Sequence, residues 1–275
     1  MDNYLLDSIA SKEITRLKNG QLSKLEDDLS IEEPLEIRIR YHTSHGIYRT
    51  VSIAVTMRTP GTDEFLARGF LFTEGMVSDQ SQIVEAKQTE PNIIEVLLGE
   101  DVQFNPSQFS RNFYTTSSCG VCGKASIESI HSETIHLPWK SGFKIESEIL
   151  MSLPKILFDQ QVSFSKTGGI HACALVDKQG VFIDIKEDVG RHNAMDKLIG
   201  ANPNYPLSDA MILVSGRASF ELVQKASKAG VGLMAAIGAP SSLAVQLAEE
   251  QGMTLMGFLK RDGFNIYCGE GRVLH

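Results

Sequence analysis

The stretch that decides the fold reads AMILVSG at residues 210–216, SFELVQKASKAG at 219–230, VGLMAAIG at 231–238, SSLAVQLAEEQG at 241–252 and TLMGFL at 254–259. Short apolar runs of strand length alternate here with longer segments whose apolar residues recur at helical spacing. This alternation is typical of parallel βαβ crossovers, whose ligands bind at the carboxyl ends of the strands. In this chain those ends are residues 215–217, 239–242 and 258–263, which converge if the strands are neighbours.

The segments before this stretch predict further elements. HACALVDKQGVFIDI at 171–185 predicts two strands joined at 178–180, and a helix is expected over 192–199. Two alternating runs between 34 and 58, separated by Ser44-His45-Gly46, predict a β-hairpin. Thr59-Pro60-Gly61 ends it, and DEFLARGFLFTEG at 63–75 predicts a core-packing helix that begins with two acidic residues.

These patterns indicate an α/β fold in four parts. We expect an N-terminal extension over 1–30, a smaller β-rich α+β subdomain over 31–115, a mobile CxxC loop over 116–135 and an α/β domain over 136–275. The loop is expected to be mobile because it is rich in glycine and has loop-like flanks.

Composition excludes several classes of protein. The chain has 275 residues, 42% of them hydrophobic, which is enough to bury a substantial core. A net charge of -8 and the lack of any basic block argue against binding to duplex nucleic acid. No apolar run approaches the roughly 20 residues that cross a bilayer, and the amino terminus does not resemble a signal peptide. We therefore expect a soluble cytoplasmic protein without membrane insertion.

The segment SSCGVCGKAS at 117–126 is the densest in chemistry. A thiolate such as that of Cys119 becomes more populated near a cation such as Lys124 or near a helix amino terminus, and would then be a nucleophile. The alternative is that Cys119 and Cys122 form half of a zinc site, although Cys173 and Cys268 are single and distant. On residues alone, sulfur or redox chemistry, zinc binding and an inert pair all remain open.

Two enzyme classes fit the CxxC less well. A thioredoxin-like motif follows a strand directly, whereas this one follows the loop-like QFNPSQFSRNFYTTSS. A zinc deaminase places His-x-Glu before Pro-Cys-x-x-Cys, but here His131-Ser132-Glu133 comes after the pair and no proline precedes it.

Four other segments are candidate ligand contacts. EDVGRHNAMDK at 187–197 is either a site or a charged helix cap, and TGG at 167–169 with His171 is either an anion contact or a simple turn. Ser219 and Ser241 either cap helices or help to bind phosphate. FLKRDG at 258–263 combines an aromatic face, cations suited to a diphosphate and a carboxylate that could pair with a guanine edge, unless it is a surface turn.

Taken together, the segments resemble the FdhD/NarQ family of formate dehydrogenase accessory sulfurtransferases. The resemblance spans roughly residues 32–267 and rests on RTPGTDEFLARGFLFTEG, SSCGVCGKAS, TGGIHACAL, EDVGRHNAMDKLIG, SGRASFELVQKA and APSSLAVQLA in this order. Cys173 departs from the alanine expected there, and Cys268 and Glu270 stand where threonine and proline are more usual. None of these departures removes a site residue.

The resemblance implies a fold, a function and partners. It implies a cytidine deaminase-like three-layer α/β sandwich in the C-terminal part, and a homodimer. It also implies a sulfurtransferase that accepts persulfide sulfur from a cysteine desulfurase on Cys119, with help from Cys122. The sulfur would pass to the molybdenum cofactor Mo-bis(molybdopterin guanine dinucleotide), and then with that cofactor to the catalytic subunit of formate dehydrogenase.

The residues assigned to these roles form two groups, and no metal ligands are assigned. Cys119 and Cys122 are the expected catalytic residues. The residues expected to bind the cofactor or a guanine nucleotide-like ligand are Ser215, Arg217, His192, Phe258, Leu259, Lys260, Arg261, Asp262 and Gly263. The rival is a non-catalytic chaperone of the cofactor or apo-enzyme that holds zinc in its CxxC.

Overall fold

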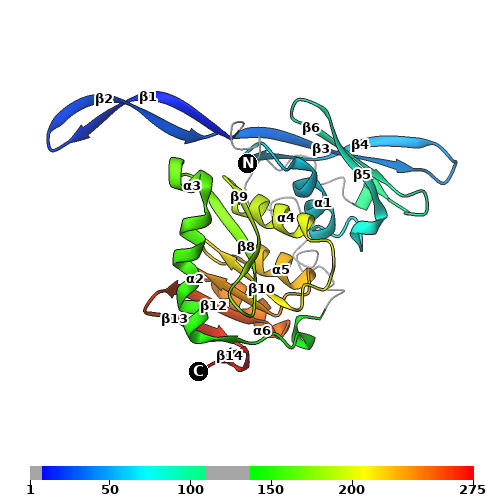
Figure 1. Ribbon diagram of the computed structural model, residues 1–275. Coiled ribbons are helices and arrows are strands. Elements are labelled where there is room, and N and C mark those ends of the chain that lie inside the picture. The colour runs from blue at the N-terminus through cyan, green and yellow to red at the C-terminus, as the bar shows by residue number, and fades with distance from the viewer. Residues whose placement is uncertain (1–7, 109–136) are drawn as a thin grey trace.

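The computed structural model describes residues 8–108 and 137–275 (Figure 1). Its largest element is a six-stranded sheet with the strand order β13-β12-β11-β10-β8-β9. The strands are β8 His171–Asp177, β9 Phe182–Asp188, β10 Ala210–Val214, β11 Leu233–Ala236, β12 Thr254–Lys260 and β13 Gly263–Cys268. Strands β10, β11 and β12 are parallel neighbours, so the predicted βαβ stretch is confirmed.

Helices cover both faces of this sheet. The helices are α2 Ser147–Gln160, α3 Val162–Thr167, α4 Arg191–Ala201, α5 Phe220–Lys228 and α6 Ser242–Glu250. Side chains of α4, α5 and α6 share one apolar cluster with the sheet, and side chains of α2 share another cluster on the opposite face. Alternate residues of β8 divide accordingly, with Leu175 in the first cluster and Ala174 in the second. Because both faces are covered, the central strands are apolar throughout.

The amino-terminal half contains a four-stranded sheet with the order β4-β3-β6-β5 and a helix beside it. These elements are β3 Glu33–His42, β4 Tyr48–Arg58, α1 Asp63–Thr73, β5 Ile83–Glu90 and β6 Ile93–Leu98. Strands β3 and β4 are antiparallel and α1 starts at Asp63, so the predicted hairpin and helix are confirmed. The two predicted strands of 171–185 and the helix after them are likewise confirmed as β8, β9 and α4.

The two sheets share one hydrophobic core. A single cluster of buried side chains runs from Leu35 and Ile37 of β3, through Leu66 of α1 and Leu198 of α4, to Leu255 of β12. The chain is therefore a mixed α/β protein whose two sheets pack against common helices. The likeness to cytidine deaminases and the expected subdomain boundaries stay predictions.

Residues 9–30 form an arm. Strands β1 Ile9–Lys18 and β2 Gln21–Ser30 pair antiparallel through all of their residues, and Figure 1 shows the ribbon standing away from the body. A hydrogen bond of 2.7 Å between the hydroxyls of Ser30 and Thr167 ties its base to α3.

The remaining elements are short. Strand β7 Ile145–Glu146 pairs in parallel with β14 Val273–Leu274. The 3-10 helices are Gln80–Gln82, Pro106–Gln108, Pro138–Lys140 and Glu270–Arg272. None of the described helices has both the length and the apolar character needed to cross a membrane.

Candidate functional site

Three turns meet at one edge of the six-stranded sheet, as the sequence predicts. The amide of Gly238 donates to the carbonyl of Gly216 at 2.9 Å, and the amide of Phe258 donates to the carbonyl of Gly238 at 3.0 Å. A bridge between Ala218 and Pro240 continues the contact. The carboxyl ends of β10, β11 and β12 are thus brought into one continuous surface, where ligands of such sheets bind.

The glycines make this close approach feasible. A Cβ atom on Gly238 would lie 3.0 Å from the carbonyl oxygen of Gly216 and 3.1 Å from Cγ of Arg217. A Cβ atom on Gly257 would lie 2.7 Å from Cδ of Pro240. Side chains at these positions would push the turns apart, so the small residues maintain the shape of the edge.

Three helices begin at the same edge. Strand β9 runs in the same direction as β10, because each is antiparallel to β8. Helices α4, α5 and α6 directly follow β9, β10 and β11, so their amino termini lie at the ligand edge. Unpaired amides and the positive end of each helix dipole favour anions there. Of the two serines considered as caps, Ser241 caps α6 through the amide of Ala244, whereas Ser219 makes no capping bond.

His192 lies on α4 beside α5. Its Nε2 atom is 3.3 Å from a carboxylate oxygen of Glu221 and 3.4 Å from the hydroxyl of Ser219. The hydrogen bond with His192 is the main reason that the pKa of Glu221 falls to about 2. The imidazole is therefore oriented by neighbours on α5, and it lies at the start of α4 where anions are favoured.

Basic side chains lie near His171 at this edge. Arg191, His192 and Arg217 lie close enough to His171 to lower its pKa, and burial lowers it most. Because its pKa is below the ordinary value, the His171 ring is neutral at pH 7 and can both donate and accept. The side chain of Arg217 is exposed at the same edge.

Ser215 has a partly structural role. Its hydroxyl accepts from the amide of Ala172 at 2.9 Å, and its own amide donates to the carbonyl of Ala172 at 2.9 Å. Ser215 thereby extends the pairing of β8 with β10 beyond the last strand residue. The hydroxyl proton remains a donor that a ligand can use.

The loop at Phe258–Gly263 presents an aromatic ring and charges to solvent. Phe258 is 43% exposed and has φ +52, a left-handed conformation that bulky residues seldom adopt, at an irregularity in the β12–β13 pairing. Lys260, Arg261 and Asp262 are exposed as well. Leu259 is fully buried in the core on the α2 side, so only its backbone can contact a ligand.

Most polar residues of EDVGRHNAMDK hold the two sheets together. The ammonium of Lys197 lies 2.7 Å from Asp188 and donates to the carbonyl of Thr59 at 2.8 Å. Asp188 also accepts from the amides of Thr59 and Gly190, and Asp196 pairs with Lys225 at 2.9 Å. These residues are buried. They are therefore neither a solvated cap nor ligand contacts, whereas Arg191 and His192 at the start of α4 lie near His171 at the ligand edge.

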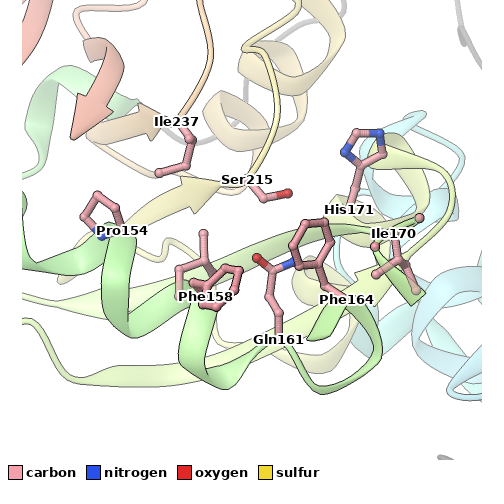
Figure 2. A pocket seen from close by; sticks show the side chains of 11 residues that line it. Pro154, Phe158, Gln161, Phe164, Ile170, His171, Ser215 and Ile237 are labelled. Carbon is pink, nitrogen blue, oxygen red and sulfur yellow. The ribbon is translucent and has the colours of Figure 1, made fainter. Parts of the chain in front are cut away.

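A pocket of about 470 Å³ opens beside this edge, between the sheet and the α2–α3 corner (Figure 2). Its walls are Pro154, Leu157, Phe158, Gln161, Phe164, Gly168, Gly169, Ile170, His171, Ser215 and Ile237. Gly168 ends α3 in a left-handed turn, so the TGG segment forms a helix end and part of the pocket wall. Sequence reasoning missed the α2–α3 residues, because a phenylalanine or glutamine at the end of a helix carries no distinctive signal.

Of the four cysteines, Cys173 and Cys268 lie among the described residues. Cys119 and Cys122 lie outside the described residues, as does the predicted mobile loop that contains them. Cys173 is buried, and burial raises the pKa of its thiol, which makes it a poor nucleophile. Burial also raises the pKa of Cys268. Within 8–108 and 137–275, no three histidine, cysteine or acidic side chains are grouped as metal ligands.

Comparisons with known proteins identify the family. The family model described as FdhD/NarQ family matches residues 31–274. A protein named sulfur carrier protein FdhD from Streptomyces coelicolor is 43% identical over 95% of this chain and 94% of its own. One of the same name from Saccharolobus solfataricus is 38% identical over 95% of this chain and 96% of its own.

A solved structure supports the fold. It comes from Desulfotalea psychrophila, is described as a candidate formate dehydrogenase accessory protein, and covers 97% of this chain and 99% of its own with a TM-score of 0.76. At 21% identity this likeness shows the fold alone. The family match over nearly the whole chain and relatives of about 40% identity show that this chain belongs to the FdhD/NarQ family.

Proposed function

We propose that this protein is a sulfurtransferase that carries persulfide sulfur on Cys119. It takes the sulfur from a cysteine desulfurase and delivers it to Mo-bis(molybdopterin guanine dinucleotide), which formate dehydrogenase requires for activity. The observation that carries the proposal is that relatives named sulfur carrier proteins match about 95% of the chain at 38–43% identity. The paired thiols of SSCGVCGKAS supply chemistry suited to that role.

The first step is a thiol exchange. The thiolate of Cys119 attacks the outer sulfur of the desulfurase persulfide, the S–S bond breaks, and the desulfurase leaves as a thiolate. Cys119 then carries the persulfide. A lowered pKa of Cys119 would favour this step because it raises the thiolate fraction at neutral pH.

Cys122 assists the second step. Its thiolate attacks the inner sulfur of the Cys119 persulfide, the one bonded to Cβ. The S–S bond of the persulfide breaks and the outer sulfur leaves as sulfide toward the cofactor. A disulfide between the two cysteines remains. Oxidation of the two cysteine thiols to this disulfide supplies the two electrons that convert sulfane sulfur into sulfide. A thiol reductant from solution must then restore both cysteines before the next cycle.

The edge of the six-stranded sheet is the proposed cofactor surface. Three helix amino termini and the cations Arg217, Lys260 and Arg261 suit the phosphates of a dinucleotide. The exposed ring of Phe258 suits a heterocycle, and the Asp262 carboxylate suits a guanine edge. His192, Ser215 and the backbone of Leu259 and Gly263 complete the surface.

The proposed partners follow from this role. They are a cysteine desulfurase, the catalytic subunit of formate dehydrogenase and a second copy of this chain in a homodimer. The proposed location is the cytoplasm, where the desulfurase and the unfolded or apo form of the enzyme would meet the carrier. Duplex nucleic acid is not expected to bind, because the charge is -8.

Intact-protein mass spectrometry under non-reducing conditions tests the proposal. Wild type, Cys119→Ala and Cys122→Ala are incubated with a cysteine desulfurase and cysteine. A sulfur adduct that a reductant removes is expected on wild type and Cys122→Ala and not on Cys119→Ala. An adduct that depends on Cys122 alone would reverse the two roles. No adduct on any protein, together with stoichiometric zinc and loss of structure in chelator, would favour the zinc-holding chaperone.

A further inference from the structure

The pocket beside the cofactor edge contains a buried polar group without a partner. Gln161 is 4% exposed and lines the pocket, and among the described residues its Nε2 atom has no hydrogen-bond acceptor. Figure 2 shows its amide lying among the pocket residues, between Phe158 and Phe164. A buried donor without an acceptor destabilises the folded protein, so a native structure retains one chiefly where something else satisfies it.

The walls around this amide suit a flat ring. Phe158 is 57% exposed at the pocket, and its ring makes an edge-to-face contact with Phe164 at 6.0 Å between centroids. Aromatic faces bind planar heterocycles by stacking. The volume of about 470 Å³ falls within the usual range for small-molecule pockets.

Polar groups are available on the opposite wall. Ser215 keeps its hydroxyl proton for a ligand, and the neutral ring of His171 can donate or accept. Both residues lie at the carboxyl edge of the sheet, while Gln161 is on the facing α2–α3 corner. A ligand between these walls would meet hydrogen-bonding groups at its edges and apolar surfaces on its faces.

The pocket adjoins the surface proposed for the cofactor on two sides. Ile237 lines the pocket, and the next residue, Gly238, accepts the hydrogen bond from Phe258. His171 lines the pocket and feels the charges of Arg191 and Arg217. A ligand with a ring in the pocket can therefore extend its charged part onto the basic edge.

We propose that this pocket is a subsite for a fused bicyclic heterocycle of the purine or pterin kind, held by the Gln161 amide and stacked on Phe158. The inference rests on the proposed function, because it names where one ring system of the dinucleotide cargo binds. Guanine and pterin share a pyrimidine ring with an amino and an oxo group, so each presents acceptors to the Gln161 amide. The subsite is additional to Phe258, which does not line the pocket and whose amide donates to the carbonyl of Gly238.

Isothermal titration calorimetry of the full chain with guanosine diphosphate and with 6-hydroxymethylpterin tests the inference. Ribose 5-phosphate, which has no heterocycle, is the control ligand. We expect Gln161→Leu to weaken binding of the preferred heterocycle about tenfold, the effect of one lost hydrogen bond. Phe158→Ala should weaken it as well, and its exposed position allows the variant to fold. The matched control is Gln88→Leu, an exposed glutamine of β5.

Thermal unfolding separates a ligand contact from a structural role. Gln161→Leu removes an unpaired buried donor, so its melting temperature without ligand should equal or exceed that of wild type. A lowered melting temperature with unchanged binding would show that Gln161 acts in folding and would overturn the inference. Whichever heterocycle binds more tightly identifies the end of the dinucleotide that the pocket holds.

Three further results would overturn the inference. In the first, neither heterocycle binds to wild type. In the second, the heterocycles bind equally well to wild type, to Gln161→Leu and to Phe158→Ala. In the third, ribose 5-phosphate binds as tightly as the heterocycles. Sulfur loading of Cys119 is measured by mass spectrometry on the same preparations. Normal loading with a failed binding test would reject the subsite alone, whereas absent loading would reject the carrier role.

Discussion

Lys197 is a fully buried cation whose charge is matched by Asp188 at 2.7 Å. The carboxylate also accepts from the amides of Thr59 and Gly190, and the ammonium donates to the carbonyl of Thr59. Thr59 lies between the first sheet and α1, so the pair joins two distant parts of the chain. Buried charges are tolerated only when they are paired and hydrogen-bonded in this way.

Replacing one member of the Lys197–Asp188 pair should therefore destabilise the folded protein. Lys197→Met should lower the free energy of unfolding by about 3–5 kcal/mol, because it leaves the Asp188 charge buried without its counter-ion. The measurement is urea denaturation at pH 7. Lys155→Met is the matched control, since Lys155 pairs with Asp159 at an exposed position of α2 and should change stability by at most about 1 kcal/mol. Equal effects of the two substitutions would contradict this view of Lys197.

Glu221 predicts a pH dependence of stability. Its hydrogen bond with His192 lowers the folded-state pKa to about 2 from an ordinary value of 4.5. Because the folded protein favours the ionised carboxylate, this interaction stabilises the fold fully above pH 4.5. The stabilisation is lost as the pH falls from 4.5 toward 2.

The difference in melting temperature between wild type and Glu221→Gln should therefore be largest above pH 5 and should shrink as the pH falls below 4.5. Thermal unfolding monitored by circular dichroism from pH 3 to pH 7 measures it. A difference that grows on acidification would show that the interaction favours the protonated carboxyl instead.

Helices α1 and α4 approach each other unusually closely. A Cβ atom on Gly69 would lie 1.9 Å from the carbonyl oxygen of Asp196, and one on Gly200 would lie 1.9 Å from the carbonyl oxygen of Phe65. Two glycines on facing helices thus allow direct backbone contact. This contact fixes the separation of α4, the helix that carries His192, from α1.

Gly69→Ala should destabilise the protein by about 3 kcal/mol, at the upper end of overpacking, because the atom it meets is backbone and cannot rotate away. Urea denaturation measures the change. Gly142→Ala is the control, because no atom lies within 4 Å of the Cβ position there, and its effect should stay below about 1 kcal/mol in either direction. A neutral Gly69→Ala would mean that the two helices can separate without loss.

The two sheets form one cooperative structure at the scale of the whole molecule. One apolar cluster extends from β3 to β12, buried ion pairs link α4 to β9 and to α5, and the hydroxyl of Thr73 ties α1 to Asp196 and Lys225. Neither sheet can lose its packing without exposing core residues of the other. The arm of β1 and β2 lies outside this core in Figure 1.

Calorimetric unfolding of the full chain should accordingly show one transition, with a calorimetric enthalpy close to the van't Hoff enthalpy. Two resolved peaks would show that the residues of β3–β6 and those of β8–β13 unfold as separate domains. Lys197→Met should lower the temperature of the single transition without splitting it.

The sequence alone determined the elements and their order. The apolar runs of 210–259 predict β10, α5, β11, α6 and β12 because burial on both faces of a parallel sheet leaves a pattern that can be read locally. The convergence of 215–217, 239–242 and 258–263 follows from the same pattern. The family was also recognisable from its motifs, since these lie in short continuous segments.

Only the tertiary structure decided which polar residues are structural and which face a ligand. Asp188, Asp196 and Lys197 have the same residue types as a catalytic cluster, but their partners Thr59 and Lys225 are distant in sequence. The pocket of Gln161 depends in the same way on the α2–α3 corner meeting the sheet edge. Burial and partnership depend on contacts between segments far apart in the chain, and no local pattern records them.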